Sequence, residues 1–320
     1  MIRWGVAGPG KIAAQFAEGM TMVPDGSIVA VASRAIERAD AFADRFGIDR
    51  RYGDYESLAA DADVDAVYVA TPHSWHAANS ILFLGARKHL LCEKPLAVSA
   101  HEAATMVQAA RANGVFLMEA MWSRFLPAYR ILVDLLGEGR IGDPLLVEGD
   151  FGFRVPVEPD HRLFAPALGG GATLDLGVYP VQLCTLVLGP PERVVADGVV
   201  GSTAVDEVVA AVLHHPGDRI GVIKAAIRAT LACRGRVTGT QGWIDLPAFM
   251  HRPEWLEVGG AAGSERIEAG YRGEGLRFQV MEVHECLAAG GLESEVMPLD
   301  ESLVVARVLD QIRSQVGIDV

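Results

Sequence analysis

A lysine at the end of an expected strand is well suited to move a proton. Residues 90–93 are Leu, Leu, Cys and Glu, and Lys94 and Pro95 follow. The pattern predicts a buried parallel strand whose carboxyl end presents Lys94 to a crevice, because open α/β sheets bind ligands at that end. Partial burial lowers the pKa of a lysine, which lets it transfer protons near neutral pH. A solvated loop lysine is the alternative interpretation.

A carboxylate and a phenol form a second stretch with chemical potential. Residues 169–171 are glycines, which allow the backbone to run next to a ligand, and a helix is expected from about Leu174. Asp175 and Tyr179 are four residues apart and so share one face of that helix. Together with Lys94 they would form a proton-transfer set. Taken alone, the pair is better explained as a helix-start charge and a core tyrosine.

The N-terminus has the pattern of a dinucleotide-binding loop. The apolar strand Ile2–Ala7 leads into Gly8-Pro9-Gly10-Lys11-Ile12-Ala13, which is the G-x-G-x-x-A fingerprint. Gly8 permits a tight turn, and Gly10 lets the backbone approach a pyrophosphate. The helix that follows can hold phosphate at its N-terminus. A purely structural turn is the alternative, but the flanking strand and helix favour a cofactor site from Gly8 to Ile12.

The end of the second strand, Ser27–Ala32, favours NADP over NAD. An NAD site usually has an acidic residue here, whereas this chain has Ser33, Arg34 and, one turn later, Arg38. A carboxylate ~4 Å from a 2′-phosphate would be repelled by roughly 4 kcal/mol per charge pair. Arg34 reverses that sign and can make a bidentate phosphate contact. The alternative is that both arginines only solvate the helix 36–46. We expect NADP, with NAD possible.

The next core strand, Ala66–Ala70, also ends in residues that could meet the cofactor. The two histidines after it suggest no metal site, because no third ligand is near and their spacing suits no standard zinc site. They lie beside the cofactor or cap a helix. We place at the cofactor the residues that follow this strand and the pair before Pro95, namely Thr71, Pro72, His73, His76, Glu93 and Lys94.

Strands and helices alternate over the first ~120 residues, which predicts a parallel, doubly wound sheet. Later segments instead alternate polar and apolar residues, which is typical of an antiparallel sheet with one covered face. These segments are 145–153, 206–213 and 220–230, and residues 235–244 look like two strands around a glycine turn. We therefore expect a Rossmann domain at 1–120 and an α+β domain at 121–320 with a large, mostly antiparallel open sheet. Helices are expected at 275–289 and 300–316, and the last could pack back on the first domain.

Composition limits the partners. The 320 residues carry a formal net charge of −13 and half are hydrophobic, which fits a soluble globular protein and argues against nucleic acid or an anionic membrane as partner. No leader segment or membrane-length apolar run is recognised. The cysteines are widely spaced, which suits reduced thiols and a cytoplasmic location. They are Cys92, Cys184, Cys233 and Cys286.

Three motifs together resemble the Gfo/Idh/MocA family of NAD(P)-dependent oxidoreductases, over essentially the whole chain. They are Gly8–Ala13, Glu93-Lys94-Pro95 and Asp175–Tyr179. Residues 119–122 and 162–164 look like the branch with dimeric dihydrodiol dehydrogenases and NADP-dependent D-xylose 1-dehydrogenases. The resemblance implies a Rossmann domain followed by an α+β domain whose open sheet commonly forms the oligomer interface. A homodimer or homotetramer through that sheet is therefore expected.

The resemblance also implies roles for individual residues. Lys94 and Tyr179 belong to the catalytic set, and Asp175 supports them. Trp122 lines the substrate pocket with Tyr179, and Arg162 is a further candidate for a substrate contact. Many relatives have histidine where Tyr179 stands, so the polyol branch fits better. Which of Lys94 and Tyr179 exchanges the proton directly stays open.

The implied reaction is reversible oxidation of a carbinol in a sugar, polyol or vicinal diol, with hydride passing to NADP. Two other functions stay open. Some relatives are hydrolases that use tightly held NAD for a transient oxidation during glycosidic cleavage. A non-catalytic NADP-binding sensor is the third possibility, although Lys94 and Tyr179 are both present.

Overall fold

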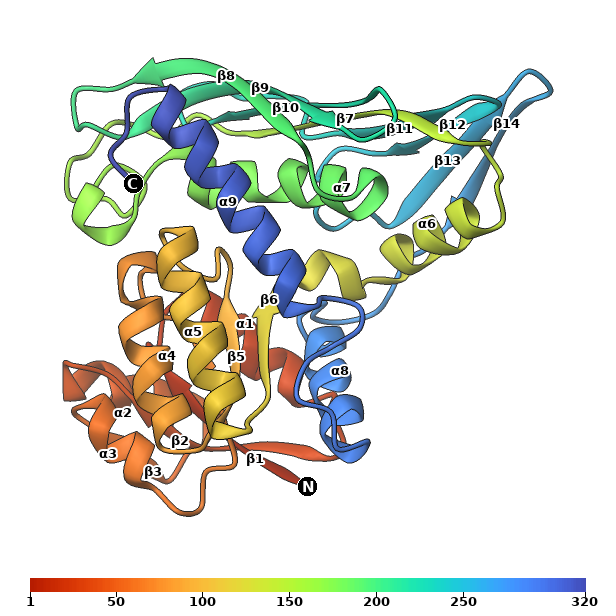
Figure 1. Cartoon of the computed structure of the whole chain (residues 1–320). Coiled ribbons are helices and arrows are strands. Elements are labelled where there is room, and N and C mark those ends of the chain that lie inside the picture. Colours follow the sequence, from red (N-terminus) through yellow and green to blue (C-terminus); the bar gives the residue numbers. More distant parts are fainter. The chain divides into compact units, whose positions relative to one another are not determined.

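The computed structural model describes all residues from Met1 to Val320, and the chain divides into two compact units (Figure 1). The first unit contains Met1–Phe125 and Arg272–Ser302, and the second contains Leu126–Tyr271 and Leu303–Val320. The first segment ends at Phe125, and the domain boundary expected after residue 120 stays a prediction. The sequence pattern gives no sign of the return of Arg272–Ser302 to the first unit.

The first unit is built on a sheet of six parallel strands in the order β3-β2-β1-β4-β5-β6. This confirms the doubly wound parallel sheet expected from the sequence. The strand order reverses between β1 and β4, and ligands of such sheets bind at that point, outside the carboxyl ends. The strands are β1 (Ile2–Ala7), β2 (Gly26–Ala32), β3 (Arg50–Tyr52), β4 (Ala66–Val69), β5 (His89–Glu93) and β6 (Leu117–Ala120).

Helices surround this sheet (Figure 1). Two of them have the N-caps typical of helix starts: the side chains of Asp54 and Ser99 accept hydrogen bonds from the backbone N–H groups of Ser57 and Glu102. The helices are α1 (Lys11–Met20), α2 (Ile36–Phe46), α3 (Tyr55–Ala60), α4 (His76–Gly85), α5 (Ala100–Asn113) and α8 (Arg277–Ala288), with short 3₁₀ turns at His73–Trp75 and Trp122–Phe125.

Helix α8 belongs to the late segment that returns to the first unit, and it packs beside α1. The indole N–H of Trp4 on β1 donates to Nε2 of His284 on α8 at 3.0 Å. Gly26 leaves room for that ring, since a Cβ there would lie 2.7 Å from His284 Cε1. The cover of β1 is therefore completed by a helix whose His284 lies 280 positions from Trp4 in the chain.

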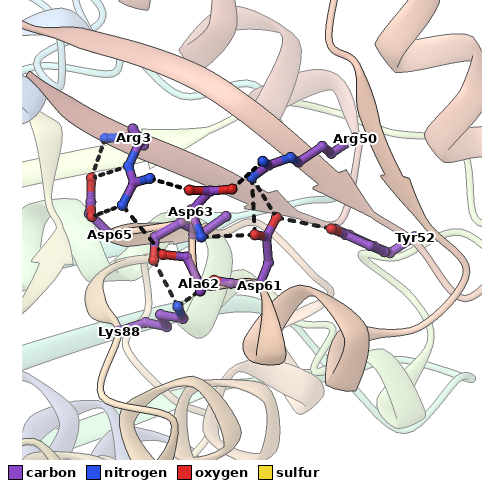
Figure 2. Close-up of polar contacts among 9 residues, drawn as sticks. Arg3, Arg50, Tyr52, Asp61, Ala62, Asp63, Asp65 and Lys88 are labelled. Carbon is purple, nitrogen blue, oxygen red and sulfur yellow. Dashed lines mark hydrogen bonds and ion pairs between the residues drawn. The ribbon is translucent and has the colours of Figure 1, made fainter.

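An ion-pair cluster ties together the amino ends of these strands (Figure 2). The Arg3 guanidinium contacts Asp65 at 2.8 Å and Asp63 at 2.7 Å, and Arg50 contacts Asp61 at 3.0 Å and also Asp63. Hydrogen bonds from the arginines hold the pKa values of Asp63 and Asp65 below their usual range. The three carboxylates of this loop are thus neutralised locally.

A lysine completes the same cluster from beneath the loop (Figure 2). Lys88, just before β5, donates to the backbone carbonyls of Asp61 at 2.6 Å and Val64 at 2.8 Å. The Tyr52 hydroxyl donates to the Asp61 carboxylate at 2.9 Å. Burial lowers the pKa of Lys88. These contacts fix the amino ends of the strands and leave their carboxyl ends to the candidate site.

The second unit contains an eight-stranded sheet in the order β14-β13-β12-β11-β7-β10-β9-β8. Only β7 and β10 pair in parallel, so the expected large, mostly antiparallel sheet is confirmed. The strand expected over 220–230 ends at Ala226, and β8, β13 and β14 add to the predicted strands. The strands are β7 (Pro144–Gly152), β8 (Arg193–Val200), β9 (Asp206–His215), β10 (Arg219–Ala226), β11 (Gly235–Gly239), β12 (Gly242–Leu246), β13 (Trp255–Gly260) and β14 (Gly263–Glu268).

One side of this sheet is covered by the buried helix α7 (Val178–Leu188), which packs on β7 and β10, whereas no helix lies on the other side (Figure 1). The stretch Pro166–Leu188 is long and apolar enough to span a membrane, but 89% of its apolar window is buried, as in the core helix of a soluble protein. Helix α6 (Pro127–Gly137) also belongs to this unit, and α9 (Leu299–Gln315) continues into it from the first.

Candidate active site

The glycine loop after β1 has the geometry that a dinucleotide needs. Gly8 has φ +90°, and a Cβ there would lie 2.9 Å from the Ala70 carbonyl oxygen and 3.0 Å from the Thr71 nitrogen. Around Gly10, by contrast, the space for a Cβ is empty, so that a phosphate can approach the backbone. Helix α1 begins at Lys11 and directs its first N–H groups to the same place. The loop therefore fits a pyrophosphate.

Two arginines provide positive charge at the end of β2. The Arg34 guanidinium lies over the Trp75 ring, 5.0 Å from its centroid, and both side chains are exposed. Burial raises the pKa of the nearby Tyr55 hydroxyl, while the charges of Arg34 and Arg38 lower it. The preceding Ser33 is buried. The arrangement fits a 2′-phosphate, and Trp75, which the sequence analysis did not single out, holds one arginine by a cation–π contact.

Residues 94–96, here called the lysine loop, follow β5. The Gly8 loop, Thr71 and Lys94 therefore follow three adjacent strands at their carboxyl ends. Lys94 is half-buried, and its peptide bond to Pro95 is cis. The buried Glu93 carboxylate accepts a hydrogen bond from the Tyr68 hydroxyl at 2.5 Å and one from the Lys94 backbone N–H at 3.3 Å. The buried Glu93 carboxylate thus holds the start of the lysine loop against the interior of the first unit.

His76 connects this loop to the loop after β4. Its ring is completely buried, and Nδ1 and Nε2 each lie 2.9 Å from a backbone carbonyl oxygen, of Pro95 and Thr71 respectively. Burial lowers the pKa of His76. Asn79 donates to the Thr71 hydroxyl at 3.2 Å. The buried His76 ring thus holds two loops together, whereas His73 is partly exposed, and the cofactor contacts expected for both stay predictions.

Glu119, the third anchor of the lysine loop, comes from β6. Its side chain is 1% exposed, and Oε1 accepts a hydrogen bond from the Leu96 N–H at 3.0 Å. Burial raises the pKa of Glu119 to about 7, and the charge of the nearby Arg124 opposes that rise. Glu119 is the first residue of the motif 119–122, but no role was predicted for it from the sequence. An acid inside an apolar strand was the signal that could have identified it.

In the second unit, Asp175 and Arg162 form a bidentate ion pair. Arg162 Nη1 lies 2.8 Å from Asp175 Oδ1, and Nη2 lies 3.2 Å from Oδ2. Asp175 is buried and Arg162 is exposed. The regular helix expected from Leu174 begins only at Val178, because Thr173–Gly177 is a π-helix. The wider π turn changes the spacing of side chains, so the α-helical face shared by Asp175 and Tyr179 does not apply there.

Tyr179 lies in an aromatic cluster of the second unit. Its ring centroid is 5.4 Å from that of Phe151 on β7 and 5.2 Å from that of His251, and these two rings stack at 4.6 Å. Sequence reasoning missed Phe151 and His251. Phe151 belongs to a strand recognised by its alternation, but no local pattern marks His251 in its loop.

Each unit therefore assembles its own part of the predicted site. The first brings together the glycine loop, the arginines and Lys94, and it also contains Trp122, which is partly exposed. The second brings together Asp175 and Arg162 and places Tyr179 at the start of the next helix.

Comparison with known proteins agrees with these motifs. A family model described as "Oxidoreductase family, NAD-binding Rossmann fold" matches residues 2–121, and one described as "GFO/IDH/MocA C-terminal domain" matches residues 129–245. Trans-1,2-dihydrobenzene-1,2-diol dehydrogenase of Danio rerio is 38% identical over 327 residues, which cover 99% of this chain and 97% of that protein. The enzyme of the same name from Mus musculus is 38% identical over 331 residues, with coverage of 99% and 97%.

A solved structure is similar over the full length as well. It is a 3-ketoreductase from Actinomadura kijaniata in complex with NADP and TDP-benzene, with a TM-score of 0.86, 27% identity and coverage of 98% of both chains. Its fold, the two matched domains and the full-length relatives extend the likeness well beyond three short motifs. The chain belongs to the Gfo/Idh/MocA family of oxidoreductases.

Proposed function

We propose that this oxidoreductase uses NADP to interconvert a carbinol and a carbonyl in a sugar, polyol or vicinal diol. The observation that carries the proposal is the placement of the Gly8 loop, Thr71 and Lys94 after three adjacent strands, β1, β4 and β5. A proton-transfer group and a dinucleotide cradle thus occur at one edge of one sheet. The named relatives, two diol dehydrogenases and a ketoreductase with NADP, support the same chemistry.

The residues of the first unit bind the cofactor and orient the reacting groups. The backbone at Gly8 and Gly10 accommodates the pyrophosphate, and Arg34 and Arg38 bind the 2′-phosphate. When bound, the nicotinamide accepts or donates the hydride. Lys94 polarises the reacting hydroxyl of the substrate or takes its proton, in a loop held by three buried side chains.

The residues of the second unit complete the proton transfer. The Tyr179 hydroxyl is the other candidate to exchange the proton with the substrate oxygen. The guanidinium of Arg162 keeps the Asp175 carboxylate in one orientation by two hydrogen bonds. Phe151 and His251 pack on the Tyr179 ring and restrict its movement. Trp122 is assigned to the substrate pocket.

The direct test is to measure nicotinamide reduction by the purified protein, with NADP and with NAD, on aldoses, inositols and a cyclic trans-diol. We expect net formation of NADPH with at least one aldose or diol. Cleavage of a glycoside with no net change in cofactor would instead identify a hydrolase. NADP binding without turnover on any of these compounds would identify a sensor.

Arg34→Ala is expected to raise the KM for NADP by about 10- to 100-fold and leave the KM for NAD unchanged. The reason is that a hydrogen bond to a charged group contributes about 1.5–3 kcal/mol, and only NADP carries the 2′-phosphate. Initial rates with both cofactors measure this. The matched control is Arg45→Ala, because Arg45 lies on the adjacent helix α2 and pairs with Glu18. Equal loss with both cofactors would contradict the assignment.

We also propose that the uncovered side of the eight-stranded sheet joins two copies of the chain. A depression of about 570 Å³ on that side is lined by Trp255 and by charged side chains of both signs, including Glu148, Lys224 and Arg236. A two-fold axis can bring such opposite charges together. Light scattering of the protein after size exclusion would distinguish monomer, dimer and tetramer.

The four free cysteines support a cytoplasmic location.

A further inference from the structure

Asp206 is a buried carboxylate that the proposed reaction does not use. It is the first residue of β9, and its side chain is 1% exposed. Oδ2 accepts two hydrogen bonds from a single residue, one from the Thr173 backbone N–H at 2.6 Å and one from the Thr173 hydroxyl at 2.7 Å. Burial of a carboxylate is costly unless such bonds compensate it. The charge of Asp206 is therefore directed at Thr173.

Thr173 is the first residue of the π-helix Thr173–Gly177, which contains Asp175. Helix α7 follows without a break and contains Tyr179 near its start. π-helical turns are rare and frequently occur at functional sites, because they place side chains differently from an α-helix. The carboxylate of Asp206 thus holds the first residue of the segment that carries Asp175 and leads into Tyr179.

The glycines before the π-helix are explained by the same contact. Gly171 has φ +119°, and a Cβ there would collide with Asp206 Oδ1. At Gly170, a Cβ would lie 2.8 Å from the carbonyl oxygen of Leu163 and 2.9 Å from that of Arg162. These two glycines allow the Arg162 backbone on one side and Asp206 on the other to approach the start of the π-helix. The room that the sequence analysis assigned to a ligand is occupied by the protein itself.

A buried arginine faces Asp206 from another element. Arg313 lies in the last turn of α9 and is 9% exposed. Burial raises the pKa of Asp206, whereas the bonds from Thr173 and the charge of Arg313 lower it. Asp310 also faces Arg313, at 3.9 Å. The carboxylate thus has a cationic neighbour from α9 in addition to its bonds to the π-helix.

We propose that Asp206 is a positioning residue for the reaction. By holding Thr173 it fixes the π-helix, and with it the orientation of Asp175 toward Arg162 and the start of the helix that presents Tyr179. The inference rests on the proposed function, in which Asp175 and Tyr179 act at the substrate. It adds a residue from β9 to the support of the π-helix and α7, which carry Asp175 and Tyr179.

The test compares Asp206→Ala, Asp206→Asn and Thr173→Val. We expect Asp206→Ala to lower kcat at least about tenfold, since it removes two charge-assisted bonds, while the Kd for NADP stays unchanged because the cofactor residues belong to the first unit. Asn retains an amide oxygen that accepts the Thr173 N–H, so it should restore most of kcat. In a double mutant, Thr173→Val should add little to Asp206→Ala, because the hydroxyl bond that it removes is already lost with the carboxylate.

Glu207→Ala is the matched control. Glu207 is the next residue of β9, equally buried, and its carboxylate pairs with Arg228 at 3.0 Å instead of with the π-helix. We expect Glu207→Ala to lower the free energy of unfolding of the second unit without lowering kcat. Folded Asp206→Ala with wild-type kcat, or the same fall in kcat for Glu207→Ala, would overturn the inference.

A second measurement separates this inference from the proposed function. If the wild-type protein turns over no sugar or diol, the proposed function fails, but backbone hydrogen exchange still tests the contact. We expect residues 172–178 to exchange at least about tenfold faster in Thr173→Val than in Glu207→Ala, because local opening becomes easier once the Thr173 hydroxyl no longer bonds Asp206. Equal protection in all variants would overturn the positioning role, even if Asp206→Ala did not fold.

Discussion

Lys94→Met is expected to lower kcat by about 10²- to 10⁴-fold, the range that positioned acid–base groups contribute. Methionine fills a similar volume and cannot hold a proton. Three buried side chains, Glu93, His76 and Glu119, hold the loop of Lys94 through contacts that do not involve its ammonium group. NADP should therefore still bind, and the loss should appear in kcat with little change in the Kd for NADP.

Tyr179→Phe tests the other candidate for the same proton. Phenylalanine retains the ring contacts with Phe151 and His251, so any loss of kcat reports the missing hydroxyl. The pH–rate profiles of the two variants assign the roles: the variant that retains activity but loses one limb of the wild-type profile identifies the group that titrates. Tyr52→Phe is the control, because the Tyr52 hydroxyl donates to Asp61 and so belongs to the ion-pair cluster instead of the candidate site. Near-wild-type turnover in both variants would end the proposal.

The largest effect on stability is expected at Glu119. Its pKa in the folded protein is raised by burial to about 7 from an ordinary value of 4.5. Between these values the folded state binds more protons than the unfolded state, so the contribution of Glu119 to stability falls as pH rises through this window. A shift of about 2.5 pKa units corresponds to about 3 kcal/mol. Above pH 7 the full cost of the buried charge is present.

Glu119→Gln should remove this pH dependence. Glutamine keeps an oxygen that can accept the Leu96 N–H and carries no charge. We therefore expect the free energy of unfolding of the variant, relative to the wild type, to rise by about 3 kcal/mol between pH 4.5 and pH 8. Urea unfolding at both pH values measures it, and Glu18→Gln on the exposed side of α1 is the control. Parallel pH profiles for the wild type and Glu119→Gln would contradict the burial argument.

The features that could be predicted from sequence are those encoded locally. The strand before Lys94 and the loop Gly8–Ala13 were recognisable, because apolar runs and glycine spacing are properties of neighbouring residues. The alternation in the second half indicated its antiparallel sheet for the same reason. The pairing of Arg162 with Asp175 was not predicted, since a bidentate contact between a loop residue and a π-helix leaves no periodic signal.

The features that were missed depend on contacts distant in sequence. The π-helix was expected as an ordinary helix, because its apolar residues satisfy an α-helical pattern, whereas the Asp206–Thr173 bonds that hold its start span 33 residues. His76 was assigned to the cofactor because it follows the strand Ala66–Ala70. Only the structure shows that backbone carbonyls surround its ring. The sequence alone does not distinguish a histidine that titrates from one whose buried ring holds two loops together.

The late return of Arg272–Ser302 to the first unit has a consequence for biosynthesis. At about 5–20 residues per second, the ribosome needs roughly 7 to 30 s to extend the chain from Phe125 to Arg272. During that time Trp4 and the neighbouring face of β1 are not yet covered by helix α8, and the Trp4 indole N–H cannot donate to His284. The nascent first unit thus exposes an apolar surface until translation is almost finished. Chaperones that bind such surfaces should associate with the nascent chain throughout this interval and leave once α8 emerges.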